Sequence, residues 1–102
     1  MKRCIFCLIL FVLISFSLAQ TTYVPDDNFE QSLIDLGYDD VLDDYVLTAN
    51  ISGVTSLNVE AKEISDLAGI EDFTALTDLN CGFNQLASLD VSSNTALTVL
   101  RC

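Results

Sequence analysis

The 102-residue chain contains no histidine, and after its first twenty residues it has only two basic side chains, Lys62 and Arg101. Without histidine, neither a Ser-His-Asp nor a Cys-His catalytic arrangement can be built within the chain. The sequence also lacks a glycine-rich phosphate loop and any set of cysteines or histidines at metal-site spacing. Carboxylate pairs of the glycosidase kind are available, but nothing predicts a cleft around them. We therefore predict that this segment is not an enzyme and uses no cofactor.

The shortage of basic residues makes the protein strongly acidic. All 15 aspartates and glutamates follow residue 20, so this part of the chain has a net charge of −13. Such a surface repels nucleic-acid phosphates and anionic lipid headgroups. The composition therefore predicts that the partner is neither nucleic acid nor a membrane surface.

The first 19 residues have the three parts of a secretory signal. Lys2 and Arg3 precede an apolar run over residues 4–16, and Ser17-Leu18-Ala19 supplies the small residues that signal peptidase reads. The run is shorter than the roughly 18 to 20 residues of a spanning helix, and no basic segment follows it. An uncleaved membrane anchor is the alternative. We expect cleavage after Ala19, a secreted or cell-surface location, and no membrane insertion after cleavage.

The second half of the chain repeats itself. Residues 54–59, 76–81 and 97–102 share the pattern apolar-Thr-x-Leu-x-apolar, with starts 22 and then 21 residues apart. Ile64-Ser-Asp-Leu67 is matched by Leu86-Ala-Ser-Leu89, and Asn84 falls where such a pattern expects asparagine. A period of roughly 20 to 29 residues with this spacing is typical of a leucine-rich repeat, which contributes one short parallel strand per turn of a solenoid.

These patterns predict an α/β solenoid in three parts. Residues 1–19 are the signal peptide, 20–53 a short helical N-terminal cap, and 54–102 about two and a third repeats, divided as 54–75, 76–96 and a partial 97–102. The cap helix should begin near Pro25, with Asp27 and Glu30 at capping-box spacing. It should bury a face of Phe29, Leu33 and Leu36 and stop at Gly37. A second short element over 41–47 should lead into the first strand near Ile51.

Alternate residues of each strand should face the core and the concave surface. We expect Leu57, Val59, Leu79, Cys81 and Leu100 to point inward, and Leu67, Leu86 and Leu89 to close each coil. The Asn84 side chain should hydrogen-bond the backbone of its bend, whereas Lys62, at the same position of the first repeat, must point outward. The outward residues are the candidate binding site: Ser56, Asn58, Glu60, Asp78, Asn80, Phe83, Val99 and Arg101. Phe83 is either an exposed contact anchor or folds over the rim onto a neighbouring loop.

Two further groups have a structural and a functional interpretation. Cys81 and Cys102 share one column, and we favour two small buried thiols over a disulfide, because in-register side chains run parallel. Asp39, Asp40, Asp43 and Asp44 form two i, i+4 carboxylate pairs that could hold calcium. The EF-hand order of ligands is absent, so we predict a solvated acidic face and no metal site.

Three segments resemble one kind of protein. They are Tyr23-Val-Pro-Asp-Asp-Asn-Phe-Glu-Gln, Ile64-Ser-Asp-Leu-Ala-Gly-Ile70, and Leu79-Asn-Cys81 with Leu89-Asp-Val-Ser-Ser-Asn-Thr-Ala-Leu97. They are similar to the opening of secreted leucine-rich-repeat proteins of marine and gut Bacteroidetes, whose repeats resemble those of bacterial internalins. The resemblance implies a module that binds a protein or glycan at the cell surface. The alternative is a non-catalytic repeat region of a longer secreted enzyme or adhesin that serves only as a spacer. Because the chain stops at Cys102, inside its third strand, we expect a truncated protein or a fragmentary gene model.

Overall fold

The computed structural model describes residues 19–102, so the predicted signal segment lies outside the described residues except for Ala19. No helix within residues 19–102 has the length and apolar character needed to cross a membrane. The elements in chain order are β1 Thr21–Tyr23, α2 Asp27–Asp35, β2 Tyr45–Leu47, α3 Thr48–Ile51, β3 Ser56–Asn58, the 3-10 helix η3 Ile70–Asp72, β4 Asp78–Asn80 and β5 Val99–Arg101.

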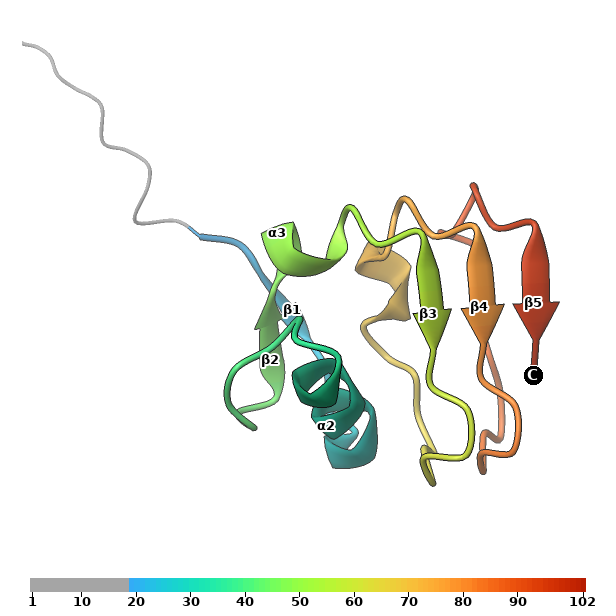
Figure 1. The fold of residues 1–102 in the computed structure, drawn as a ribbon, viewed down its shortest axis with the longest axis horizontal. Helices are drawn as coiled ribbons and strands as arrows, with labels where there is room; N and C mark the ends of the chain where they lie inside the picture. Colours follow the sequence, from blue (N-terminus) through green and yellow to red (C-terminus); the bar gives the residue numbers. More distant parts are fainter. Residues whose placement is uncertain (1–18) are drawn as a thin grey trace, which may run out of the picture.

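The three repeat strands form one parallel sheet in the order β3-β4-β5, and Figure 1 shows them side by side and pointing the same way. Leu57, Leu79 and Leu100 share one register row. The predicted alignment of the repeats is therefore confirmed. Leu57, Val59, Leu79 and Cys81 are buried as expected. Leu100 is 46% exposed, so its predicted burial is wrong, because β5 is an edge strand that packs against β4 on one side only.

Asparagine side chains complete the hydrogen bonding of the bends. The Asn84 Oδ1 accepts from the amides of Lys62 and Ile64, and its Nδ2 donates to the carbonyls of Val59 and Cys81. All four distances are 2.9 to 3.0 Å, so one side chain ties two successive coils together as predicted. A second asparagine was not anticipated. Asn94 is 3% exposed and donates to the carbonyls of Ile70 and Phe73.

Helix α2 begins at a different residue from the one that the sequence suggested. Asp26 is the N-cap, and its Oδ1 accepts from the amides of Asn28 and Phe29. The predicted capping box of Asp27 and Glu30 is wrong, because Asp26 already has the extended backbone of an N-cap and Glu30 turns inward.

The far end of α2 follows the prediction in part. Phe29 and Leu33 are fully buried, but Leu36 is 47% exposed because the helix ends at Asp35. Gly37 has φ +88, and the amide of Tyr38 donates to the carbonyl of Leu33. This is the glycine-terminated helix end that was expected.

The remaining N-terminal elements depart from the prediction. β1 and β2 pair antiparallel, and α3 follows β2 directly. The first repeat strand begins at Ser56 rather than near Ile51, which is instead a buried residue of α3. The buried apolar side chains nevertheless form one cluster that runs from this N-terminal unit (residues 21–51) into the repeats, and the rings of Phe29 and Phe73 lie 6.3 Å apart within it.

Cys81 and Cys102 are paired as a disulfide, with Cα atoms 4.7 Å apart. That separation lies within the range that a disulfide bridges. The prediction of two buried thiols is therefore wrong. Cys81 is buried, but Cys102 follows β5 and is exposed, so its side chain is free to turn towards its neighbour instead of lying parallel to it.

Candidate binding surface

The outward side of β3, β4 and β5, which we call the strand face, carries the candidate binding residues in rows. Ser56, Asp78 and Val99 form one row of the register, and Asn58, Asn80 and Arg101 form the next. They flank the inward leucines and so point to the opposite side of the sheet. Glu60 and Phe83 follow the ends of β3 and β4.

Side chains of neighbouring repeats contact one another on the strand face. The Asn80 Nδ2 donates to Glu60 Oε1 at 2.9 Å, and the Arg101 guanidinium lies 3.2 Å from Asp78 Oδ1. The Arg101–Asp78 pair is exposed, so it adds at most about 1 kcal/mol of stability. The pair places the Arg101 guanidinium beside the carboxylate of Asp78 on the neighbouring strand.

Phe83 is the most unusual residue of this surface. Its side chain is 84% exposed, which contradicts the alternative that it folds over the rim onto a neighbouring loop. Its φ is +57, the same as that of Ala61, 22 residues earlier, so the bend itself demands a left-handed residue. That conformation costs a non-glycine residue roughly 1 to 2 kcal/mol. Burial of the ring does not offset the cost.

Four of the eight candidate residues surround one hollow. A depression of about 580 Å³ is lined by Glu60, Asn80, Gly82, Phe83, Arg101 and Cys102. The structure thus brings Glu60, Asn80, Phe83 and Arg101 together, while Ser56, Asn58, Asp78 and Val99 lie outside the hollow. A ligand on this face would meet one aromatic ring, one guanidinium and a preformed amide–carboxylate pair.

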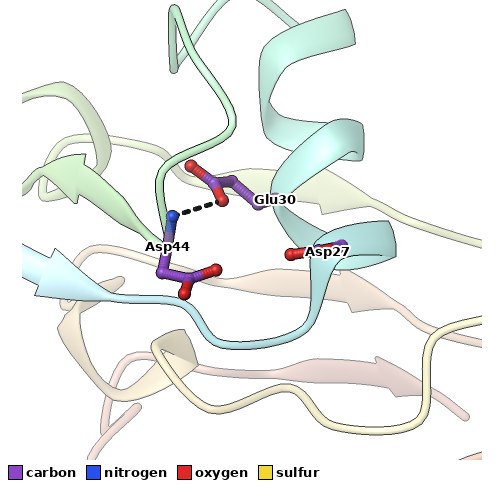
Figure 2. A group of neighbouring side chains, drawn as sticks. All are labelled: Asp27, Glu30 and Asp44. Carbon is purple, nitrogen blue, oxygen red and sulfur yellow. Dashed lines mark hydrogen bonds between the residues drawn. The ribbon is translucent and has the colours of Figure 1, made fainter.

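Of the two carboxylate pairs that the sequence suggested, the structure brings Asp39 and Asp43 together but places Asp40 and Asp44 apart. Residues 39–44 form a loop, and Asp39 and Asp43 gather with Glu30, whereas Asp44 gathers with Asp27 and Glu30 (Figure 2). In each group one carboxylate oxygen from each residue lies within 4.8 Å of the others, and Asp40 belongs to neither group. Glu30 was missed as a member. The available signal was its place in α2, directly after Phe29 and one turn before Leu33, where a residue turns towards the core.

Glu30 fastens the loop to helix α2. Its side chain is fully buried and accepts hydrogen bonds from the amides of Asp43, at 3.1 Å, and Asp44, at 2.8 Å. Burial, followed by the hydrogen bond with Asp39, raises the pKa of Glu30 to about 7, and the two amides act against that rise. The arrangement is first of all structural, since it fixes a loop that has no helix or strand of its own.

Comparisons with known proteins give the same fold. No family model matches the chain. It is 38% identical over 73 residues to Internalin J of Listeria monocytogenes serotype 4b (strain F2365). The aligned segment makes up 72% of this chain and 8% of that protein. The functional domain of InlJ from Listeria monocytogenes, which includes a cysteine ladder, superimposes with a TM-score of 0.65 and 36% identity over 78% of this chain and 18% of that one. The internalin InlF from Listeria monocytogenes strain 4b F2365 gives a TM-score of 0.69 and 25% identity over 78% of this chain and 24% of that one.

These relatives are much longer than the chain. It spans less than a tenth of the curated relative and less than a quarter of either solved structure. Origin in Bacteroidetes stays a prediction, since the three relatives named are Listeria proteins. The parallel repeat strands, the asparagine bends and the two structural superpositions agree with one another. The chain has internalin-like leucine-rich-repeat homology and the solenoid fold of internalin repeat domains.

Proposed function

We propose that this chain is a non-catalytic module that recognises a protein or glycan at the cell surface through its strand face. The observation that carries the proposal is Phe83, a large ring held 84% exposed on a left-handed backbone. The bend imposes the same backbone on Ala61, so the feature that folding does not explain is the exposed ring. Exposed aromatic residues beside polar groups are frequent anchors of binding interfaces.

The polar surroundings of Phe83 support recognition. The partly buried Asn80 side chain is held by its hydrogen bond to Glu60, whereas Arg101 forms an exposed pair with Asp78. Ordering side chains on binding costs roughly 0.5 to 1.5 kcal/mol each. Side chains that are already ordered reduce that cost and present the same donors and acceptors to every partner.

The proposed organisation of the chain follows the predicted boundaries. A signal peptide of 19 residues directs secretion, residues 20–53 form a cap, and 54–75, 76–96 and 97–102 are two complete repeats and part of a third. In support, the apolar side chains of residues 21–51 continue the core of the first repeat. Cys81 and Cys102, which are joined by a disulfide, occupy the same position in successive repeats, and the functional domain of InlJ likewise includes a cysteine ladder.

The test compares the two basic residues of the described chain. The 102-residue chain is screened on a glycan array and against immobilised extracellular proteins, and any binder is then measured with two variants. We expect Arg101→Gln to weaken binding about tenfold, since an interfacial charge of this kind is worth about 1.4 kcal/mol or more. Lys62→Gln makes the same change in net charge away from the strand face and should leave affinity unchanged.

If both variants lose affinity equally, the effect is one of overall charge and the strand face is not the site. If a binder is found and neither variant changes its affinity, the strand face is not the site. If no binder is found, the proposal is wrong and the chain serves as a spacer.

A further inference from the structure

The outer face of the small N-terminal sheet carries large apolar side chains that are exposed within residues 19–102. β1 and β2 pair Thr21 with Leu47 and Tyr23 with Tyr45, and these four side chains share the exposed face, while Thr22 and Val46 are buried on the other. Tyr23 is 55% exposed, Tyr45 and Leu47 are each 46% exposed, and the two tyrosine rings lie 5.4 Å apart. About half of the surface of each of these three side chains is therefore open to solvent in the described part of the chain.

A hollow of about 400 Å³ continues this face into the loop after α2. Its walls include Tyr38, Tyr45, Val41 and Leu47, together with the carboxylates of Asp39, Asp40 and Asp43. Val41 is 54% exposed, although it is a large aliphatic residue. We call the surface of Tyr23, Asp39, Asp40, Val41, Tyr45 and Leu47 the N-terminal patch. It combines aromatic, aliphatic and acidic groups within one concave area.

Within residues 19–102, no lysine or arginine lines the hollow of this patch. Residues 20–61 contain no lysine or arginine, while residues 20–53 contain eight aspartates and glutamates. Arg101 is bound to Asp78 on the strand face. The Asp39 carboxyl is partly buried and hydrogen-bonds Glu30, so the carboxylates of the hollow that are open to a partner are those of Asp40 and Asp43.

We propose that the N-terminal patch docks a protein segment in which lysine or arginine stands next to apolar residues. The cationic group meets Asp40 and Asp43, and the apolar neighbours lie on Tyr23, Tyr45 and Leu47. Tyrosine rings also attract a cation directly. An anionic partner is repelled, and so is a second copy of this chain, which has the same excess of negative charge. This surface is separate from the strand face and does not depend on the function proposed for it.

The probe is a short blocked peptide, acetyl-Gly-Leu-Lys-Lys-Leu-Gly-amide, titrated into the isotopically labelled 102-residue chain. Its counterparts replace the two lysines with glutamine or with glutamate. Amide shifts measured by NMR should cluster at residues 21–23 and 38–47 for the lysine peptide. We expect affinity to fall about tenfold between 20 and 300 mM salt, because the contacts are exposed enough to be screened. The glutamate peptide should not bind.

Two variants locate the site without disturbing the fold. Asp40 is exposed and belongs to neither carboxylate group, so Asp40→Asn should weaken the lysine peptide about three- to tenfold and leave the melting temperature unchanged. Val41→Ser should weaken it to a similar extent through lost apolar contact. Glu63→Gln, an equal change of charge at an exposed position in the first repeat, is the matched control and should bind as the parent does.

Three results would overturn the proposal. One is equal binding of the lysine and glutamine peptides, which would leave the acids without a role. Another is a set of shifts on the strand face, around Asn80 and Phe83, instead of the N-terminal patch. In the third result, the lysine peptide causes no shifts, and the parent chain self-associates with rising concentration while Val41→Ser does not. That result would identify a second copy of the chain as the occupant.

Discussion

The side chain of Asp26 reaches the backbone of Ser65, 39 residues further along the chain, with its Oδ2 accepting from the Ser65 amide at 2.9 Å. The same oxygen accepts from the amide of Asp66, while the Oδ1 caps helix α2. One carboxylate therefore serves both the N-terminal unit and the bend of the first repeat. This contact links the start of helix α2 to the first repeat, and the two also share one apolar core.

Replacing Asp26 should cost more than removing an ordinary helix cap. Asp26→Ala removes a cap worth roughly 0.5 to 2 kcal/mol and also leaves the amides of Ser65 and Asp66 without their acceptor. We expect a total loss of about 2 to 4 kcal/mol in the free energy of unfolding, measured by urea denaturation. Asp27→Ala, at the exposed neighbouring residue, should cost less than about 1 kcal/mol. Equal losses for the two variants would contradict the bridging role.

The buried Glu30 should make stability depend on pH. Its pKa of about 7 in the folded protein lies above the ordinary value of 4.5, so folding favours the protonated form. Its contribution to stability is therefore complete below pH 4.5 and is lost as the pH rises through 7. The neighbouring carboxyl of Asp39 raises the pKa of Glu30 in the same direction, whereas the amides of Asp43 and Asp44 lower it.

Glu30→Gln keeps the shape of that side chain without the charge. Its carbonyl can still accept from the amide of Asp44, so the variant should fold. Between pH 5 and 8 the melting temperature of the parent should fall, and that of the variant should fall clearly less. Parallel curves for the two proteins would show that Glu30 does not titrate in this range.

The acidic groups should not select calcium. Calcium takes six to eight oxygen ligands, and each group here offers three carboxylates, with the Glu30 oxygens already accepting two amides. Calcium and magnesium at equal concentration should raise the melting temperature by similar small amounts through screening of the net charge. A shift seen with micromolar calcium alone, and abolished by Asp39→Asn, would establish a specific site and refute this expectation.

The third repeat strand should be the least protected. All three residues of β5 are exposed, and it is paired on one side only. Hydrogen exchange should therefore be fastest at the amides of residues 97–102 and slowest near Leu57 and Leu79. The disulfide to Cys81 limits this opening, so Cys102→Ser should speed exchange at β5 further without affecting β3. Uniform protection of the three strands in a monomer would contradict this description.

The repeats could be predicted from the sequence because their signals are local and periodic. Leu57 and Leu79 recur at fixed spacing, and Asn84 has few ways to satisfy a tight bend. The N-terminal unit depends instead on contacts between distant residues. Nothing local distinguishes Asp26 from Asp27 as the cap, and the inward turn of Glu30 requires the amides of a loop thirteen residues away. Three-residue strands such as β1 are also too short to give an alternating pattern.

The residues of the candidate binding surface could be predicted from the sequence, but their geometry could not. Alternation along each strand is sufficient to predict which residues face outward. It does not reveal that Phe83 has a positive φ, or that Glu60, Asn80 and Arg101 gather around it, because both depend on how one bend stacks on the next.

Phe83→Asn gives the most direct test of recognition through the strand face. Asparagine tolerates the left-handed backbone better than phenylalanine does, and little buried area is lost. The melting temperature should therefore stay the same or rise by a few degrees, while affinity for a partner identified with the parent chain should fall about a hundredfold, as for an interface anchor. Unchanged affinity in this stably folded variant would contradict the account, because Phe83 would then have neither a structural nor a binding role.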